Sequence, residues 1–142
     1  MASNYTVILG DIIRKVEMGK DGQVSTSFRK EFEIEGVDSG NSSLVTLMVK
    51  GLTGDASPVN VELNGKYIGK IEPHPNASPE SWFMQTLHFS PSEGNLNPNS
   101  KNNSTTNVLE IPAKLRKNDK PENTNQFQKF YLQNIVCFYK PK

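Results

Sequence analysis

The chain has 142 residues, a length that suits one domain built around a single two-layer core. Only 35% of its residues are hydrophobic, and its 16 basic and 15 acidic side chains, which leave a net charge of +1, are spread along the chain. This distribution argues against nucleic acid as a partner, because proteins that bind nucleic acid concentrate basic charge on one face. We therefore expect a single domain over residues 1–142 with a polar surface.

No apolar run approaches the roughly 20 residues that a membrane-spanning helix requires. The first residues, Met-Ala-Ser-Asn-Tyr-Thr, lack the basic start and apolar segment of a signal peptide. Three expectations remain: a cytoplasmic protein, one exported without a leader, or a sequence that lacks its original leader. The one cysteine, Cys137, cannot form an internal disulfide, and its apolar neighbours predict a buried thiol in a strand.

Apolar and polar residues alternate in most of the ordered-looking segments, which indicates half-buried β-strands rather than helices. The loops between these segments are rich in Gly, Pro, Asn, Asp and Ser, the residues that favour turns. In chain order, strands are expected at Tyr5–Val16 (with a bend at Gly10-Asp11), Phe28–Ile34, Ser43–Lys50, Val59–Leu63, Lys66–Ile71, Trp82–Phe89, Asn107–Ile111 and Phe127–Tyr139.

The segment from Val59 to Ile71 has the clearest local signal. Asn64-Gly65 stands between two alternating runs and supplies the two positive-φ residues of a type I′ turn, so a tight hairpin is expected. Its register places Val59, Val61 and Leu63 on one buried face.

The last predicted strand has apolar residues on both faces. Straight alternation places Phe130, Leu132, Val136 and Phe138 on one face, and Tyr131, Ile135, Cys137 and Tyr139 on the other. Such a pattern is typical of a strand that lies in the middle of a sheet and is covered on both sides.

Taken in order, these segments resemble the galactose-binding-like jelly rolls, β-sandwich modules that accompany many glycoside hydrolases. The matching segments are Phe28–Ile34, Leu44–Val49, the hairpin Val59–Gly69, the aromatic run Trp82-Phe83-Met84, Asn107–Ile111 and the closing strand Phe130–Tyr139. One motif is incomplete, because the family's glycine before the Asn-x-Leu-x-Ile segment has no close counterpart near Asn107. The resemblance implies an all-β fold: an antiparallel β-sandwich, a jelly roll of about eight strands.

No catalytic motif is visible in the sequence, and we expect no enzyme. Glu31, Glu33 and Glu35 share one strand face, but a solvated surface explains three such acids more simply than a catalytic pair does. Calcium is a possible cofactor, since many jelly rolls of this kind hold a structural ion in a loop. The loop acids available for it are Asp21, Asp38 and Asp55, without an Asp-x-Asp spacing.

Jelly-roll topology predicts that loops alternate between the two ends of the sandwich. Loops 17–27, 51–57, 73–80 and 112–126 then gather at one end, and their polar side chains with one aromatic ring suit sugar recognition. The candidate ligand-binding residues are Trp82, His74, Asn76, Asp55, Arg116, Asn118 and Asp119, with Asp21 and Asn125 nearby. Each has a structural alternative: Trp82 as a core residue, His74 as an exposed loop residue, and the others as partners of their own backbone.

Two functions remain open. The first is a non-catalytic, lectin-like module that recognises a glycan or glycoconjugate. The second is a structural, self-assembling subunit of a capsid, fibre or surface appendage, which would form a homo-oligomer through exposed strands.

Overall fold

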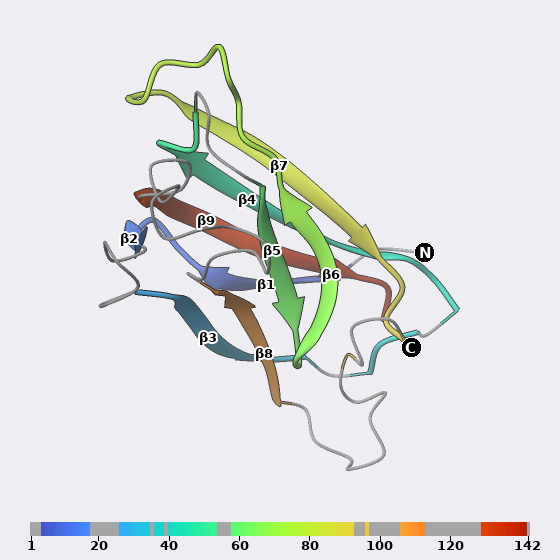
Figure 1. The fold of residues 1–142 in the computed structure, drawn as a ribbon. Helices are drawn as coiled ribbons and strands as arrows, with labels where there is room; N and C mark the ends of the chain where they lie inside the picture. The colour runs from blue at the N-terminus through green and yellow to red at the C-terminus, as the bar shows by residue number, and fades with distance from the viewer. Residues whose placement is uncertain are drawn as a thin grey trace.

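The computed structural model describes residues 4–17, 26–34, 36–38, 40–53, 58–92, 96, 106–112 and 129–141. These residues contain no helix, and therefore none that could span a membrane. They form nine strands in two antiparallel sheets that face each other as a β-sandwich (Figure 1). The strands are β1 (Asn4–Leu9), β2 (Arg14–Glu17), β3 (Phe28–Glu33), β4 (Ser43–Lys50), β5 (Val59–Leu63), β6 (Lys66–Ile71), β7 (Trp82–Phe89), β8 (Thr106–Ile111) and β9 (Lys129–Tyr139).

The strand order is that of a jelly roll. One sheet has the order β1-β9-β4-β7, with β2 also paired to β9, and the other has the order β3-β8-β5-β6. Early strands therefore pair with late ones in nested fashion: β1 and β2 with β9, β3 with β8, β4 with β7, and β5 with β6. The predicted all-β sandwich is confirmed. Nine strands replace the expected eight because the first one is interrupted at residues 10–13.

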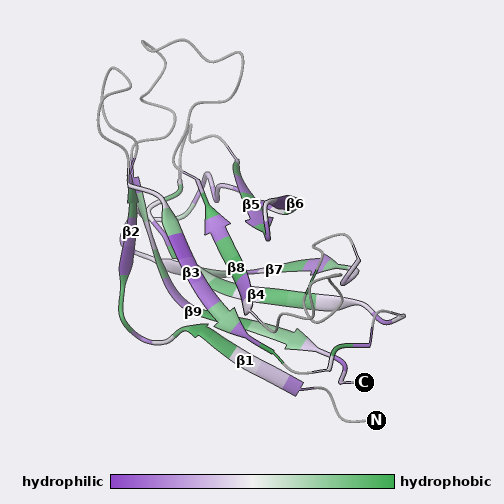
Figure 2. Ribbon diagram, turned by 90° about the horizontal axis from the view of Figure 1, so that it is seen from below, coloured by the Kyte–Doolittle hydropathy of each residue, from purple (hydrophilic) through white to green (hydrophobic). Residues whose placement is uncertain are grey.

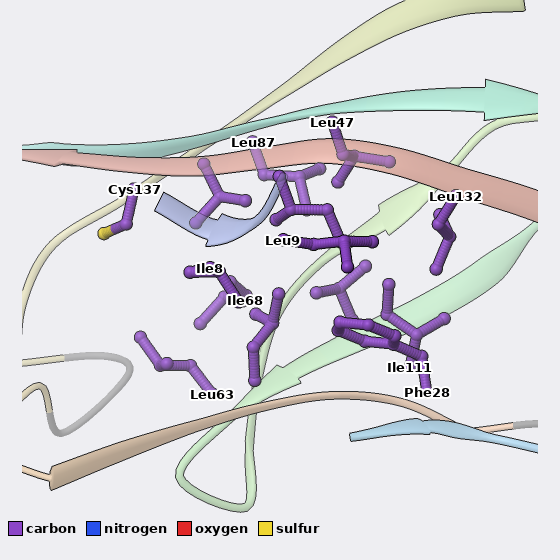
Figure 3. Close-up of a cluster of buried hydrophobic side chains, with 14 of the residues drawn as sticks. Ile8, Leu9, Phe28, Leu47, Leu63, Ile68, Leu87, Ile111, Leu132 and Cys137 are labelled. Carbon is purple, nitrogen blue, oxygen red and sulfur yellow. The ribbon is translucent and has the colours of Figure 1, made fainter. Parts of the chain in front are cut away.

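The core lies between the two sheets, where alternating strand residues meet (Figure 3). In β4, residues 43, 45, 47 and 49 are buried, while the intervening side chains face outward and are half-buried. Phe130 of β9 heads the fully buried side chains by volume, and Leu47 of the neighbouring β4 is equally inaccessible. One apolar face per strand is thus enough to build this core, in agreement with the modest hydrophobic content.

The hairpin between β5 and β6 is confirmed. Asn64 and Gly65 both have positive φ angles, 52° and 81°, and Leu63 pairs directly with Lys66 across the turn. Val61 and Leu63 are completely buried and Val59 nearly so, as the predicted register requires.

Asn64 also joins the hairpin to the neighbouring strand β8. Its Nδ2 donates to Oδ1 of the buried Asn107 (3.0 Å), and its Oδ1 accepts from the backbone N–H of Val108 (2.8 Å). Replacing Asn64 with Ala removes both bonds and places a Cβ-bearing residue without a polar side chain at positive φ. We expect the free energy of unfolding to fall by about 2 kcal/mol, measured by urea denaturation.

A matched variant separates the two causes of that loss. Asn64→Gly keeps the positive φ at no steric cost but lacks the side chain, so it is expected to recover part of the stability lost in Asn64→Ala. A stability equal to wild type in both variants would show that the bridge to Asn107 contributes nothing.

The faces of the last strand differ from the predicted alternation. Asn134 has a φ of 51°, its N–H donates to Gly10 O (2.8 Å), and the register against β4 shifts at this point. The extra residue reverses the alternation, as a β-bulge does. The buried residues are Phe130, Leu132, Ile135, Cys137 and Tyr139, whereas Tyr131, Gln133, Val136 and Phe138 face outward. The central position of the strand was predicted correctly. The assignment of its faces was wrong, and so was the expectation that both faces are covered, because only one face is buried.

Candidate functional site

Two of the loops predicted to share one end of the sandwich do meet there. The N–H of His74, in the β6–β7 loop, donates to Leu52 O after β4 at 2.9 Å. The other loops predicted at this end, 17–27 and 112–126, lie largely outside the described residues.

Three of the seven predicted ligand-binding residues can be placed. Asp55, Arg116, Asn118 and Asp119 lie outside the described residues. Asn76 is exposed in a turn of the β6–β7 loop, and Trp82 is half-buried at the start of β7.

His74 and Trp82 lie on opposite sides of β7. The exposed His74 ring packs against Phe83, with centroids 5.3 Å apart, and Phe83 packs on the core. Trp82, one residue earlier in the strand, faces outward because successive strand side chains alternate. The structure therefore does not bring these two predicted residues together on one surface.

Trp82 belongs instead to a row of side chains across the outer face of the five-stranded sheet. Lys50 is paired with Trp82 on one side and with Tyr131 on the other, and Tyr131 is paired with Lys15 of β2. The Lys50 Nζ lies 5.1 Å from the centroid of the Trp82 ring and 5.2 Å from that of Tyr131. We call these four residues, Lys15, Tyr131, Lys50 and Trp82, the Lys50 row.

Both rings attract the Lys50 ammonium, since the face of an aromatic ring is electron-rich. Lys50 forms no ion pair with any residue that the structure describes. At the end of the row, Lys15 Nζ lies 2.7 Å from a carboxylate oxygen of Glu17. This hydrogen bond raises the pKa of Lys15 and lowers the pKa of Glu17. The centre of the row thus offers a half-buried cation between two aromatic rings.

Sequence reasoning missed Lys50 and Tyr131. The alternation in β4 places Lys50 on the face opposite to that of the buried Val45, Leu47 and Val49, so its outward position could have been predicted. That Tyr131 lies next to Lys50 could not have been predicted, because this proximity depends on the register of β9 against β4, which shifts near Asn134.

The acids that the sequence suggested for metal binding or catalysis form no metal site or catalytic pair among the residues that the structure describes. Asp38 accepts hydrogen bonds from Gly40 N (2.9 Å) and Asn41 Nδ2 (2.7 Å) within its own turn. Glu31 is exposed and lies 3.6 Å from Arg29. Glu35, Asp21 and Asp55 lie outside the described residues, and within the described part of the chain no three His, Cys, Asp or Glu side chains cluster. Burial raises the pKa of the Cys137 thiol to about 12, so this group is not a nucleophile at neutral pH.

Comparison with known proteins adds no family to these observations. A scan against protein-family models and a search of curated protein sequences both found no match to the chain.

Proposed function

We propose that this domain is a non-catalytic carbohydrate-binding module whose ligand lies over the Lys50 row. The observation that supports the proposal is the ring–ammonium–ring arrangement of Trp82, Lys50 and Tyr131 on an outer sheet face. The resemblance to galactose-binding-like jelly rolls agrees with it, although sugar sites differ in place among proteins of one fold.

The chemistry of the row suits a sugar that carries an acidic group. The apolar C–H face of a pyranose packs on an aromatic ring, while an ammonium donates hydrogen bonds to hydroxyls and, more strongly, to a carboxylate. Lys50 makes no ion pair with a described residue, so an anionic substituent would be its first counter-charge there. We therefore propose glycans containing a uronic or similar acidic sugar as the ligand class.

A second polar group that we propose for the ligand is Asn76 of the β6–β7 loop. Trp82 follows directly on the β6–β7 loop, in which Asn76 is exposed. An exposed amide both donates and accepts hydrogen bonds, which suits vicinal hydroxyls. Asn76 thus keeps its proposed role, while His74, on the other side of β7, is the less suitable member of the predicted set.

The test is retention on an array of neutral and acidic glycans. Trp82→Ala is expected to weaken binding about tenfold or more, a loss of about 1.4 kcal/mol, because it removes one stacking surface. Lys50→Met keeps the aliphatic stem and removes the charge, so it is expected to abolish the preference for acidic over neutral glycans.

Tyr67→Ala is the matched control, because Tyr67 is an exposed aromatic residue on the opposite sheet. It is expected to bind as wild type does. The proposal fails if the wild-type protein is retained by no glycan, or if Trp82→Ala and Tyr67→Ala bind equally well.

A further inference from the structure

The turn of the β5–β6 hairpin contains the one Asn-Gly pair of the sequence, Asn64-Gly65. An asparagine before glycine loses its side-chain amide readily, because glycine has no Cβ to hinder attack by its backbone nitrogen. In this reaction the Gly65 nitrogen bonds to Asn64 Cγ, the Cγ–Nδ2 bond breaks, and ammonia leaves with the proton of the Gly65 N–H. Water then opens the cyclic imide at one of its two carbonyls, which leaves aspartate or isoaspartate at position 64.

The surroundings of Gly65 leave room for this chemistry. Gly65 is exposed, and beyond its chain neighbours no described atom lies within 4 Å of the position that a Cβ would take there. Whatever slows the reaction in the folded protein therefore lies in the conformation and contacts of Asn64.

The backbone of the turn holds the reacting atoms apart. Ring closure requires the Gly65 nitrogen and the Asn64 Cβ on the same side of the Cα–C bond of Asn64. Asn64 has a φ of 52°, in the left-handed region, where ψ is about +47°. For an L-residue, such a ψ places the following nitrogen nearly opposite to Cβ. The turn conformation thus keeps the attacking nitrogen away from Cγ.

The side chain of Asn64 is fixed as well. Its Nδ2 donates to Asn107 Oδ1 (3.0 Å), and its Oδ1 accepts from the N–H of Val108 (2.8 Å). The backbone N–H of Asn64 also donates to Val108 O, at 2.8 Å. Figure 1 shows the tip of the hairpin beside the beginning of β8. Both side-chain bonds must break before Cγ can turn toward the Gly65 nitrogen.

The contact on β8 is itself a polar point in a mainly apolar layer. Asn107 has no exposed surface, and a buried amide requires hydrogen-bond partners. Figure 2 shows hydrophilic colour on both sides of the hydrophobic middle of β8. When the hairpin separates from β8, Asn107 loses one of its partners, so the closed arrangement is favoured from both sides.

We propose that Asn64 is a latent modification site, which loses its side-chain amide when the hairpin separates from β8. The site lies on the sheet opposite to the Lys50 row and is independent of glycan binding. Neither product restores the native contact, since aspartate lacks the Nδ2 donor and isoaspartate adds a methylene group to the backbone of a two-residue turn. The reaction therefore converts a transient opening of the hairpin into a permanent one.

The test follows the full chain in mildly alkaline buffer, folded and in concentrated guanidinium chloride. Cleavage after Lys50 and Lys66 releases the peptide 51–66, whose mass rises by the difference between an oxygen atom and an NH group. We expect Asn64 to react at least about thirtyfold more slowly in the folded protein, the factor for two hydrogen bonds that must first break.

Two variants separate opening of the hairpin from unfolding of the whole domain. Asn107→Ala removes the acceptor of Asn64 Nδ2, so it is expected to speed the reaction of the folded protein about fivefold. Val45→Ala is the matched control, because it leaves a cavity on the opposite sheet and lowers stability while the bonds of Asn64 remain. It is expected to react as wild type does, and far-ultraviolet circular dichroism verifies that both variants are folded.

Asn60, in the same peptide, is the internal reference. The branched side chain of Val61 hinders attack by its nitrogen, so Asn60 is expected to keep its amide in all samples. The proposal is overturned by equal rates in the folded and unfolded wild type, by an Asn107→Ala rate equal to that of wild type, or by a Val45→Ala rate at least as high as that of Asn107→Ala. The wild-type comparison decides by itself if Asn107→Ala does not fold.

Discussion

Replacing Phe130 with alanine is expected to lower the free energy of unfolding by about 3–5 kcal/mol, the range for a fully buried phenylalanine. Phe130 has no exposed surface and lies on β9, which is hydrogen-bonded to β4 on one side and to β1 and β2 on the other. Since domains of this size are stable by about 5–15 kcal/mol, the change removes a large share of the total. Urea denaturation followed by Trp82 fluorescence measures it.

Phe138→Ala is the matched control on the same strand. Phe138 faces outward and is half-buried, so its truncation is expected to cost about 1 kcal/mol or less. Equal losses from the two substitutions would contradict the bulge at Asn134, because without it both rings would share one face.

The second large effect concerns pH and Cys137. Burial raises the pKa of this thiol from 9.0 to about 12, so the folded protein keeps the proton over a range in which the unfolded chain releases it. The buried, protonated thiol therefore stabilises the native state fully below pH 9, the pKa of the exposed thiol. This stabilisation is lost progressively as the pH rises toward 12. A difference of three pKa units corresponds to about 4 kcal/mol, lost at up to about 1.4 kcal/mol per pH unit.

Cys137→Ala isolates this contribution from the titration of lysines and tyrosines. Stability curves of both proteins between pH 8 and 11 are expected to converge as pH rises, since only the wild type carries the buried thiol. Parallel curves would mean that the thiol titrates alike in the folded and unfolded chains.

The parts of the fold that local chemistry determines were predictable. Asn64-Gly65 specifies a turn by the positive φ of both residues, and the alternation in β4 specifies which of its side chains are buried. The two-sheet architecture follows because each such strand has one apolar face to cover.

Features that depend on strand pairing were not predictable. The bulge at Asn134 has no distinctive local pattern, because asparagine occurs throughout the loops and the extra residue is defined only against β4. The same register brings Tyr131 beside Lys50 and thereby forms the row with Trp82. The sequence identified Trp82 as a candidate but grouped it with His74. His74 lies in a loop, where no alternation of apolar and polar residues indicates on which side of the sheet a side chain lies.

The nested strand pairing has a consequence for how the molecule forms. β9, which follows the other eight described strands in sequence, lies between β4 on one side and β1 and β2 on the other, so one sheet lacks a central strand until residues 129–139 are present. Pairing between strands that are far apart in the sequence has a high loop-closure cost, which slows folding. During synthesis on a ribosome, β1, most of β2 and one edge of β4 therefore lack their pairing partner until residues 129–139 have been made. A chaperone that shields open strand edges would act on this protein in that interval.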